Sequence, residues 1–438
     1  MQWVIGNREP AIIERLRALI RSVDVRHGVT LSAAMILAGA LDYAVSVLAG
    51  RWLAPVEYGI FISLSATLQV LNYLAIAIRN VVAFYTAELS AERDSTNLVG
   101  AFVRRAWRWA WQWGFAVTAL TVLAGPILAR FLQLPNPWPV WAAAPVVLLL
   151  FVRAITDGSL QGMQAFAGFG VLQVTQALLR LLFAAGLIGV GLQASGGIFA
   201  LPLAMAAVLA LALWWLRPQF QHPGGAARPV SWHYSSCTLL ALTSFAMLAN
   251  MDALFVKHAF SPRVAGDYAP VITLARISLY IPLSMGILLL PKVKERQARG
   301  ENARPMLLLA LAGALVPSLG LSLLFFLFPG SIVRIVFTGA YANPGMVLGL
   351  AGLAASLYAG LNIWMNYALA VEKPAFVYAL VAALIAQALG MFLFGRGNLM
   401  HMLLVMISCG AAGNLAGAAA IWNVLAVPNA ARPEIVRV

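Results

Sequence analysis

The sequence predicts an all-α polytopic membrane protein, with about 12 transmembrane helices in two parallel six-helix bundles around a central cavity. Three observations predict this class: the composition, the length of the apolar runs and an internal repeat. Of the 438 residues, 62% are hydrophobic and 10% are charged, whereas soluble domains carry about 25% charged residues. This composition excludes soluble enzyme folds, disulfide scaffolds and extended nucleic-acid-binding surfaces.

Twelve apolar runs follow one another along the chain, and each is long enough to cross a hydrocarbon core of roughly 30 Å as a helix. Clusters of proline and glycine near residues 135–139, 223–225 and 329–330 separate several runs, because a spanning helix cannot continue cheaply through them. The runs lie at residues 30–50, 59–79, 105–125, 139–158, 168–190, 196–216, 236–257, 269–290, 306–328, 346–368, 375–394 and 400–424.

The central proline and glycine cluster divides the chain into two halves of six spans. We expect N-terminal and C-terminal six-helix bundles at residues 29–217 and 236–426, joined by a cytoplasmic linker at 218–235. Residues 1–28 alternate apolar residues with arginines, a pattern typical of an amphipathic helix on the membrane surface. Residues 427–438 form the expected cytoplasmic tail.

The distribution of the basic residues predicts the orientation in the membrane. If the N-terminus is cytoplasmic, 21 of the 29 lysines and arginines lie on the cytoplasmic side and 6 lie outside. The positive-inside rule then favours cytoplasmic N- and C-termini in the inner (plasma) membrane. We interpret the formal net charge of +14 as a topology signal that also suits anionic membrane lipids, and not as evidence for a nucleic-acid partner.

The two halves repeat the same landmarks at an offset of 210 residues. Because six spans are an even number, both halves cross the membrane in the same direction, as in transporters whose halves rock around a shared cavity. No phosphate-binding G-x-x-x-x-G-K-[ST] loop occurs, which excludes a P-loop ATPase within this chain, and we expect no cofactor. The matched pairs are Asp42 and Asp252, Glu57 and Asp267, Tyr58 and Tyr268, and Phe166 and Phe376, with a looser match of Arg130 and Arg334.

Four short motifs resemble one known family, the oligosaccharide flippases of the multidrug/oligosaccharidyl-lipid/polysaccharide exporter superfamily. The sequence RWLAPVEYGIF at residues 51–61 resembles the turn between that family's first two helices, although Ala54 replaces its glycine. Similar agreement occurs at LQGMQAF (160–166), LPK (290–292) and IVRIVFTGAY (332–341). Twelve spans favour the polysaccharide branch over the peptidoglycan-precursor branch, which usually has two more helices.

This resemblance implies a flippase that moves a polyprenyl-pyrophosphate-linked oligosaccharide from the cytoplasmic to the outer leaflet by alternating access, for polysaccharide biosynthesis. Such a protein does no covalent chemistry and is not an enzyme, and its partners would include membrane lipids and a polysaccharide polymerase complex. Two alternatives stay open. One is a drug/cation antiporter of the same superfamily, and the other is a non-transporting membrane scaffold of a polysaccharide assembly complex.

Polar side chains at membrane depth are the candidate site residues, because a charge there is costly unless it faces a wet cavity or a partner. Arg180, Arg276 and Arg153 could bind a pyrophosphate, since a guanidinium offers paired donors in a fixed fork. Alternatively, each arginine pairs with an acid and locks two helices together. Asn362 and Asn366 could donate to sugar hydroxyls or bond a neighbouring helix.

The repeated aspartates, Asp42 and Asp252, are candidates for ion coupling. An unpaired carboxyl in a cavity could exchange a proton or bind sodium. The alternative is a salt bridge from Asp252 to Lys257, or from either aspartate to an arginine of the other half. We expect Lys257 and Arg79 to reach the interface with their charged ends, and the four tryptophans at 107, 109, 111 and 113 to form part of an interfacial belt.

Overall fold

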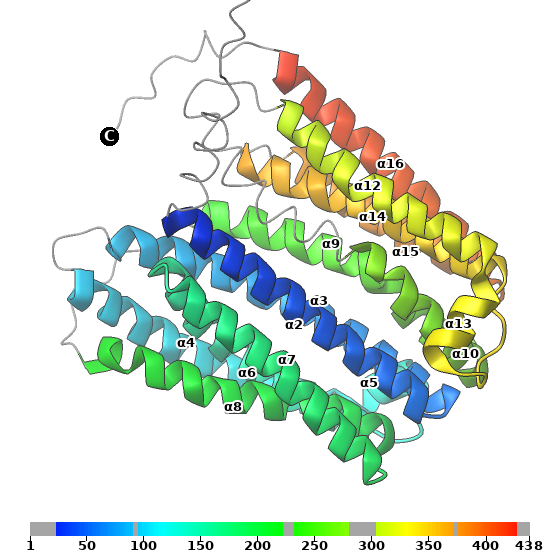
Figure 1. Cartoon of the computed structure of the whole chain (residues 1–438), viewed down its shortest axis with the longest axis horizontal. Coiled ribbons are helices and arrows are strands. Elements are labelled where there is room, and N and C mark those ends of the chain that lie inside the picture. Colours follow the sequence, from blue (N-terminus) through cyan, green and yellow to red (C-terminus); the bar gives the residue numbers. More distant parts are fainter. Residues whose placement is uncertain (1–22, 91–94, 222–231, 280–303, 372–374, 427–438) are drawn as a thin grey trace, which may run out of the picture.

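The computed structural model describes residues 23–90, 95–221, 232–279, 304–371 and 375–426, and these are helical, with short turns and no strands (Figure 1). The N-terminal half contains α2 (Val23–Trp52), α3 (Pro55–Ser90), α4 (Ser95–Leu123), α5 (Gly125–Phe131), α6 (Trp138–Gly162), α7 (Phe166–Gly189) and α8 (Gln193–Gln221). The C-terminal half contains α9 (Trp232–Ala259), α10 (Pro262–Ala275), α12 (Arg304–Leu327), α13 (Pro329–Phe337), α14 (Met346–Ala370), α15 (Ala375–Phe394) and α16 (Leu399–Ala426).

Ten described helices are long and apolar enough to cross a membrane. An eleventh span is formed if α4 and α5, which meet at an angle of 56°, count as one. The eighth predicted span, residues 269–290, begins in α10 and continues outside the described residues. The protein is therefore an all-α, multi-pass membrane protein, as the apolar runs predict.

The breaks between helices follow local sequence chemistry. Pro55, Pro262 and Pro329 each open a helix, where a missing backbone N–H costs nothing and the fixed φ suits the first turn. The side-chain oxygen of Ser261 accepts a hydrogen bond from the backbone N–H of Val264 and caps α10. These starts produce the tight two-residue turn between α2 and α3 and the equivalent turn between α9 and α10.

The internal repeat is visible in the packing order of the two halves. In the first half, α2 packs on α7, and α6 packs on α3, α4 and α8. In the second half, the equivalent helix α9 packs on α15, and α14 packs on α10, α12 and α16. A short helix follows the third long helix in both halves, and Arg130 and Arg334 lie in the last turns of these two helices. Phe166 and Phe376 lie in the first turns of the matching helices α7 and α15.

Two glycines bring α6 against the backbone of α3. A Cβ atom at Gly158 would lie 2.6 Å from the carbonyl oxygen of Arg79, and one at Gly162 would lie 2.6 Å from that of Ala83. Both positions therefore require the absence of a side chain, the usual arrangement where membrane helices approach closely. This contact forms the centre of the N-terminal bundle.

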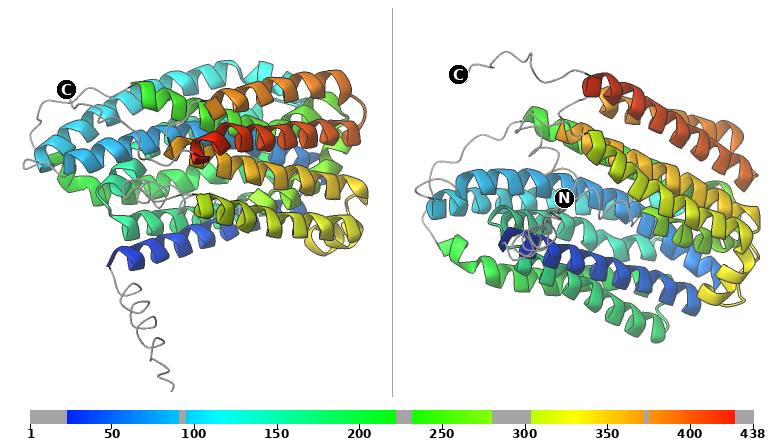
Figure 2. Two further views of the ribbon diagram at one scale, coloured as in Figure 1. Left: turned by 90° about the horizontal axis from the view of Figure 1, so that it is seen from above. Right: turned by 45° about the horizontal axis from the view of Figure 1, so that its top comes forward.

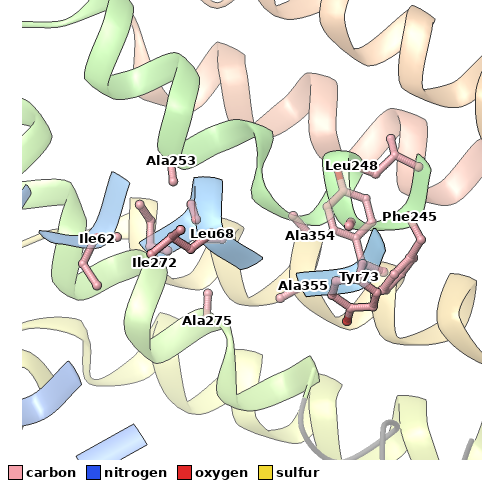
Figure 3. Close-up of a cluster of buried hydrophobic side chains, with 14 of the residues drawn as sticks. Ile62, Leu68, Tyr73, Phe245, Leu248, Ala253, Ile272, Ala275, Ala354 and Ala355 are labelled. Atoms are coloured by element: carbon pink, nitrogen blue, oxygen red, sulfur yellow. The ribbon is translucent and has the colours of Figure 1, made fainter. Parts of the chain in front are cut away.

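The two bundles share a hydrophobic core around the N-terminal half of α3. Figure 3 shows Tyr73 of α3 beside Phe245 of α9 and Ala355 of α14, and Leu68 of α3 beside Ile272 of α10. Tyr73 and Phe245 meet edge to face with ring centroids 6.0 Å apart. Figures 1 and 2 show that α12, α14 and α16 diverge from the N-terminal helices toward the end opposite α13.

The turns at residues 53–54, 132–137, 190–192 and 260–261 lie at one end of the bundles, which we call the predicted outer end. The charge distribution predicts that this end lies outside the cell. We expect a cysteine in the 51–58 turn to react with a membrane-impermeant reagent in intact cells. A cysteine between residues 292 and 304, outside the described residues, should react only after permeabilisation. Labelling of both from the same side would contradict the topology.

Candidate functional site

A small cavity lies inside the C-terminal bundle, between α9, α10, α14 and α16. Its volume is about 20 Å³, enough for one water molecule. Apolar side chains such as Ile272 and Met406 form most of its wall, and Asp252, Arg276 and Tyr358 are its polar members. An acidic and a basic side chain thus line the same small cavity, and this is the strongest candidate site in the described residues.

Arg276 is held in the cavity wall by a neutral partner. It follows the last residue of α10, and its Nη2 donates a hydrogen bond of 2.8 Å to Oδ1 of Asn250 on α9. Asn250 is oriented in turn, because its amide group donates to the carbonyl of Ala246. No carboxylate of the described residues lies within salt-bridge distance of Arg276, although Asp252 lines the same cavity.

Asp252 is buried, with 7% of its surface exposed. Its Oδ2 accepts a hydrogen bond of 3.2 Å from the Tyr268 hydroxyl, while its Oδ1 has no hydrogen-bond partner among the described residues. A buried carboxylate oxygen without a donor is costly. A proton or a cation at Oδ1 would remove that cost. The described residues contain no cluster of three metal-binding side chains.

Asp42, the counterpart of Asp252 in the repeat, is placed differently. Its Oδ1 accepts a hydrogen bond of 2.9 Å from Nη1 of Arg180, which joins α2 to α7. The partner belongs to the same half of the chain, whereas the sequence suggested an arginine of the other half. Arg180 does not line the cavity that contains Arg276, so the structure does not bring these two arginines into one central site.

Arg153 is also paired within its own bundle. Its Nη2 contacts both carboxylate oxygens of Asp157, one turn further along α6, at 3.1 and 2.9 Å. Arg79 on α3 lies over the ring of Phe169, with the guanidinium carbon 5.8 Å from the ring centre. These groups are packed inside the N-terminal bundle, and Arg153 is only 4% exposed.

Lys257 does not reach the interface, and that prediction is wrong. Only 2% of its surface is exposed, and its Nζ has no hydrogen-bond partner among the described residues. Its ammonium group lies in the last turn of α9 near the inter-bundle contact, and the expected salt bridge to Asp252 does not form. The backbone carbonyl groups at the end of α9 provide the negative dipole that a lysine at this position favours.

The two asparagines of α14 bond each other. The amide group of Asn366 donates to the backbone carbonyl and to Oδ1 of Asn362, at 2.8 and 3.1 Å. Asn362 is buried. A contact of either residue with a sugar therefore remains a prediction.

The end of α2 contacts the segment around the end of α13, across the two bundles. Arg51 donates through Nε to the Val336 carbonyl at 2.7 Å and through Nη2 to the Ile335 carbonyl at 2.9 Å. The Tyr341 hydroxyl donates to the Gly50 carbonyl at 2.6 Å. Burial, with the Asp267 carboxylate nearby, raises the pKa of Tyr341, so this donor stays protonated.

The end of α9 makes the equivalent contact with the segment around the end of α5. Gln133 donates to the His258 carbonyl at 2.6 Å, and Nδ1 of His258 lies 2.8 Å from the Phe131 carbonyl. The rings of Phe131 and His258 stack with centroids 4.2 Å apart. We call these two sets the outer contacts, and together they close the bundles against each other at the predicted outer end.

The sequence analysis missed the outer contacts because most of their acceptors are backbone carbonyls, which carry no residue signature. The repeat was the available signal. The ends of α2 and α9 are equivalent, as are α5 and α13, so a contact in one half implies a similar contact in the other.

No protein-family profile matches the chain, and no curated protein matches it. Solved structures do. The chain is similar to an inward-facing multidrug resistance MATE family transporter of the MOP superfamily, with a TM-score of 0.69 and 10% identity over 89% of this chain and 98% of that one. It is also similar to the lipid II flippase MurJ in an inward closed conformation, with a TM-score of 0.68 and 11% identity over 90% and 87% of the two chains.

The chain therefore has the same fold as these two solved structures. An outward-facing MATE transporter of the same superfamily gives a lower TM-score, 0.61, with 14% identity over 91% of this chain and 96% of that one.

Proposed function

We propose that this protein is an inner-membrane flippase that moves a polyprenyl-pyrophosphate-linked oligosaccharide from the cytoplasmic to the outer leaflet. The observation that carries the proposal is the Arg276 side chain, which lines a cavity and makes no salt bridge with a described carboxylate. The cavity would widen from its present one-water volume to admit the cargo headgroup. The fold shared with a lipid II flippase supports a lipid-linked cargo. A polysaccharide polymerase complex would be the natural acceptor of the flipped product.

Arg276 suits a pyrophosphate better than the other candidate arginines do. Arg180 and Arg153 already contact Asp42 and Asp157, whereas Arg276 is held by a neutral amide, which orients the guanidinium without cancelling its charge. A phosphate can accept two parallel hydrogen bonds from such a group. We therefore assign Arg276 the main role in binding the cargo and keep Arg180 and Arg153 as secondary candidates.

The transport cycle would alternate between the closed outer end seen here and a state in which the outer contacts separate. Fourteen described helices in two similar halves provide two units that can rock against each other. No bond of the cargo needs to be formed or broken, so we do not expect enzymatic activity.

A drug/cation antiporter is the second candidate, and Asp252 favours it. Its buried Oδ1 without a hydrogen-bond partner could bind an organic cation or the coupling ion. A cation-binding cavity would have Asp252 as its attractive group and Arg276 as a repulsive one. The two candidate functions thus predict opposite signs of cargo charge.

Proteoliposomes can distinguish these candidates. We expect the purified protein to move a fluorescent polyprenyl-pyrophosphate sugar between leaflets, measured as loss of protection from a membrane-impermeant quencher, and not to accumulate a cationic dye. Dye accumulation driven by a proton or sodium gradient, without lipid flipping, would establish the antiporter. Activity with neither cargo would favour the non-transporting scaffold.

Ion coupling is tested by replacing the repeated aspartates. If Asp252 carries a coupling ion, Asp252→Asn should flatten the dependence of transport on pH or sodium, because asparagine can still accept from Tyr268 but carries no charge. Asp42→Asn tests the same role in the N-terminal bundle and also weakens the pair with Arg180. The measurement is the initial transport rate across pH and sodium series. An unchanged dependence in the double variant would remove both residues from coupling.

A further inference from the structure

Helix α4 carries charged and aromatic side chains on the surface that faces away from the bundle. Arg105 and Arg108 are exposed, and Trp109 and Trp113 have 39% and 54% of their surface exposed. Arg105, Trp109 and Trp113 are spaced by four residues and form one column along the helix. We call these four residues the α4 stripe.

The packing of α4 on α6 sets the depth of this stripe. The two helices run antiparallel, since a Cβ at Gly114 would lie 2.8 Å from Leu148, and the rings of Trp109 and Phe151 are 6.3 Å apart. By this register Arg105 and Arg108 lie level with the part of α6 that holds Arg153. That level is roughly 9 to 14 Å inside the end of α6, at 1.5 Å per residue.

Cations at this depth need an anionic partner, and the arginines of the N-terminal bundle can obtain one in two ways. Arg153 lies inside the bundle and pairs with Asp157. Arg105 and Arg108 lie on the surface of α4 that faces away from the bundle. They make no hydrogen bond or ion pair with the described residues, and α4 itself contains no acidic residue. Their partner must come from the surroundings, and the anion available at a lipid-facing surface is a phosphate.

The tryptophans extend the same site toward the membrane centre. Trp109 lies one turn beyond Arg105, and Trp113 lies another turn deeper, about 12 Å from Arg105 along the axis. Indole rings favour this region, where the N–H can reach glycerol esters and the ring contacts the acyl chain. The stripe therefore matches the order of a phospholipid from headgroup to chain.

We infer that the α4 stripe binds an anionic phospholipid of the predicted cytoplasmic leaflet, with Arg105 and Arg108 on the phosphate and Trp109 and Trp113 along the glycerol and acyl chain. This inference does not depend on the cargo, because the stripe lies on the opposite bundle from Arg276 and outside it. A lipid held here would contact one face of the N-terminal bundle only.

Tryptophan quenching by brominated lipids tests the inference on the full chain in nanodiscs. The probes are dibrominated phosphatidylglycerol and dibrominated phosphatidylcholine at equal mole fractions. The contribution of the stripe is the quenching that disappears in Trp109→Phe/Trp113→Phe. We expect that contribution to be larger with the anionic probe than with the zwitterionic one. The ratio of the two contributions should fall by about fivefold for each arginine removed in Arg105→Gln/Arg108→Gln, which corresponds to about 1 kcal/mol per charge.

Arg217→Gln is the matched control, because Arg217 is also an exposed arginine, in α8 near the same end. It should leave the preference unchanged. Equal quenching by both probes, an unchanged preference in Arg105→Gln/Arg108→Gln, or an equal loss in the control would overturn the inference. Displacement of the anionic probe by a short-chain polyprenyl diphosphate at stoichiometric concentration would also overturn it, since the stripe would then bind cargo.

Discussion

Replacing Arg276 with alanine should abolish flipping of a pyrophosphate-linked sugar while the protein stays folded and inserted. The guanidinium is hydrogen-bonded to a neutral amide and makes no salt bridge with a described carboxylate, so its loss breaks no ion pair there, although Asp252 in the same cavity loses a nearby positive charge. The cargo phosphate, by contrast, would lose its bidentate donors in a low-dielectric cavity. That loss is worth roughly 3 to 5 kcal/mol, or at least about 100-fold in rate.

Arg276→Lys should recover only part of the activity, because an ammonium keeps the charge and loses the planar fork. Arg180→Ala provides the contrast, since it leaves Asp42 without its ion-pair partner. We expect a loss of thermal stability there, smaller than the roughly 3 to 5 kcal/mol of a fully buried pair, because the Asp42 side chain is 37% exposed. The measurements are membrane yield, thermal stability and flipping rate on the same preparations. Normal flipping by a stable Arg276→Ala protein would reject the headgroup role and advance the antiporter.

Gly266→Ala should prevent closure of the predicted outer end and so stop the transport cycle. Gly266 of α10 lies against the turn between α2 and α3, where an added Cβ would overlap the Pro55 carbonyl and lie 3.0 Å from the Val56 nitrogen. These obstacles are backbone atoms, which cannot rotate away as a side chain could. We expect the bundles to separate at this end, with transport reduced at least about tenfold, since even a 1.4 kcal/mol cost to the closed state has that effect.

The matched control is Gly320→Ala in α12, where an added Cβ meets nothing within 4 Å. Both changes raise helix propensity by a similar amount, so they differ mainly in the steric contact. The readout is alkylation of Thr273→Cys by a membrane-impermeant maleimide, in a protein whose two native cysteines, Cys237 and Cys409, are replaced by serine. The Thr273 hydroxyl bonds Tyr58 across the bundles. Faster labelling in Gly266→Ala than in the control is the expected result. Equal labelling and normal transport in both would show that this backbone contact is not needed for closure.

Hydropathy predicted the helices because crossing a membrane demands about 20 apolar residues, and that demand is visible in one dimension. The repeat predicted that Arg130 and Arg334 occupy equivalent positions in the two halves, and that Phe166 and Phe376 do so as well. Both equivalences are confirmed by the places of these residues in their helices. Span boundaries were less accurate: α3 continues to Ser90, well beyond the predicted 59–79, because a helix can project past the hydrocarbon region.

The partners of the charged residues could not be predicted in the same way. Asp42 and Arg180 are 138 residues apart, and their contact depends on the way α2 packs on α7. Asp157 is one turn from Arg153, so the spacing alone could have identified that pair. Lys257 was expected near the interface because it ends an apolar run, but the fold places α10 and the other bundle around it.

The chemistry of the outer contacts has a consequence for the evolution of this chain. Arg51, Tyr341 and Gln133 donate to backbone oxygens, and Phe131 is contacted at its carbonyl as well as at its ring. Every residue type supplies a backbone oxygen, so the exposed acceptor Ile335 can change while its contact persists, whereas Gly50 is fixed by Phe337, which lies 2.5 Å from the place of a Cβ atom. Pairwise covariation between the two halves would therefore report the core around Tyr73 and Phe245 far more strongly than the contacts that close this end. In related sequences, we expect the donor residues at the ends of α2 and α9 to vary without correlated changes at the positions that accept their hydrogen bonds.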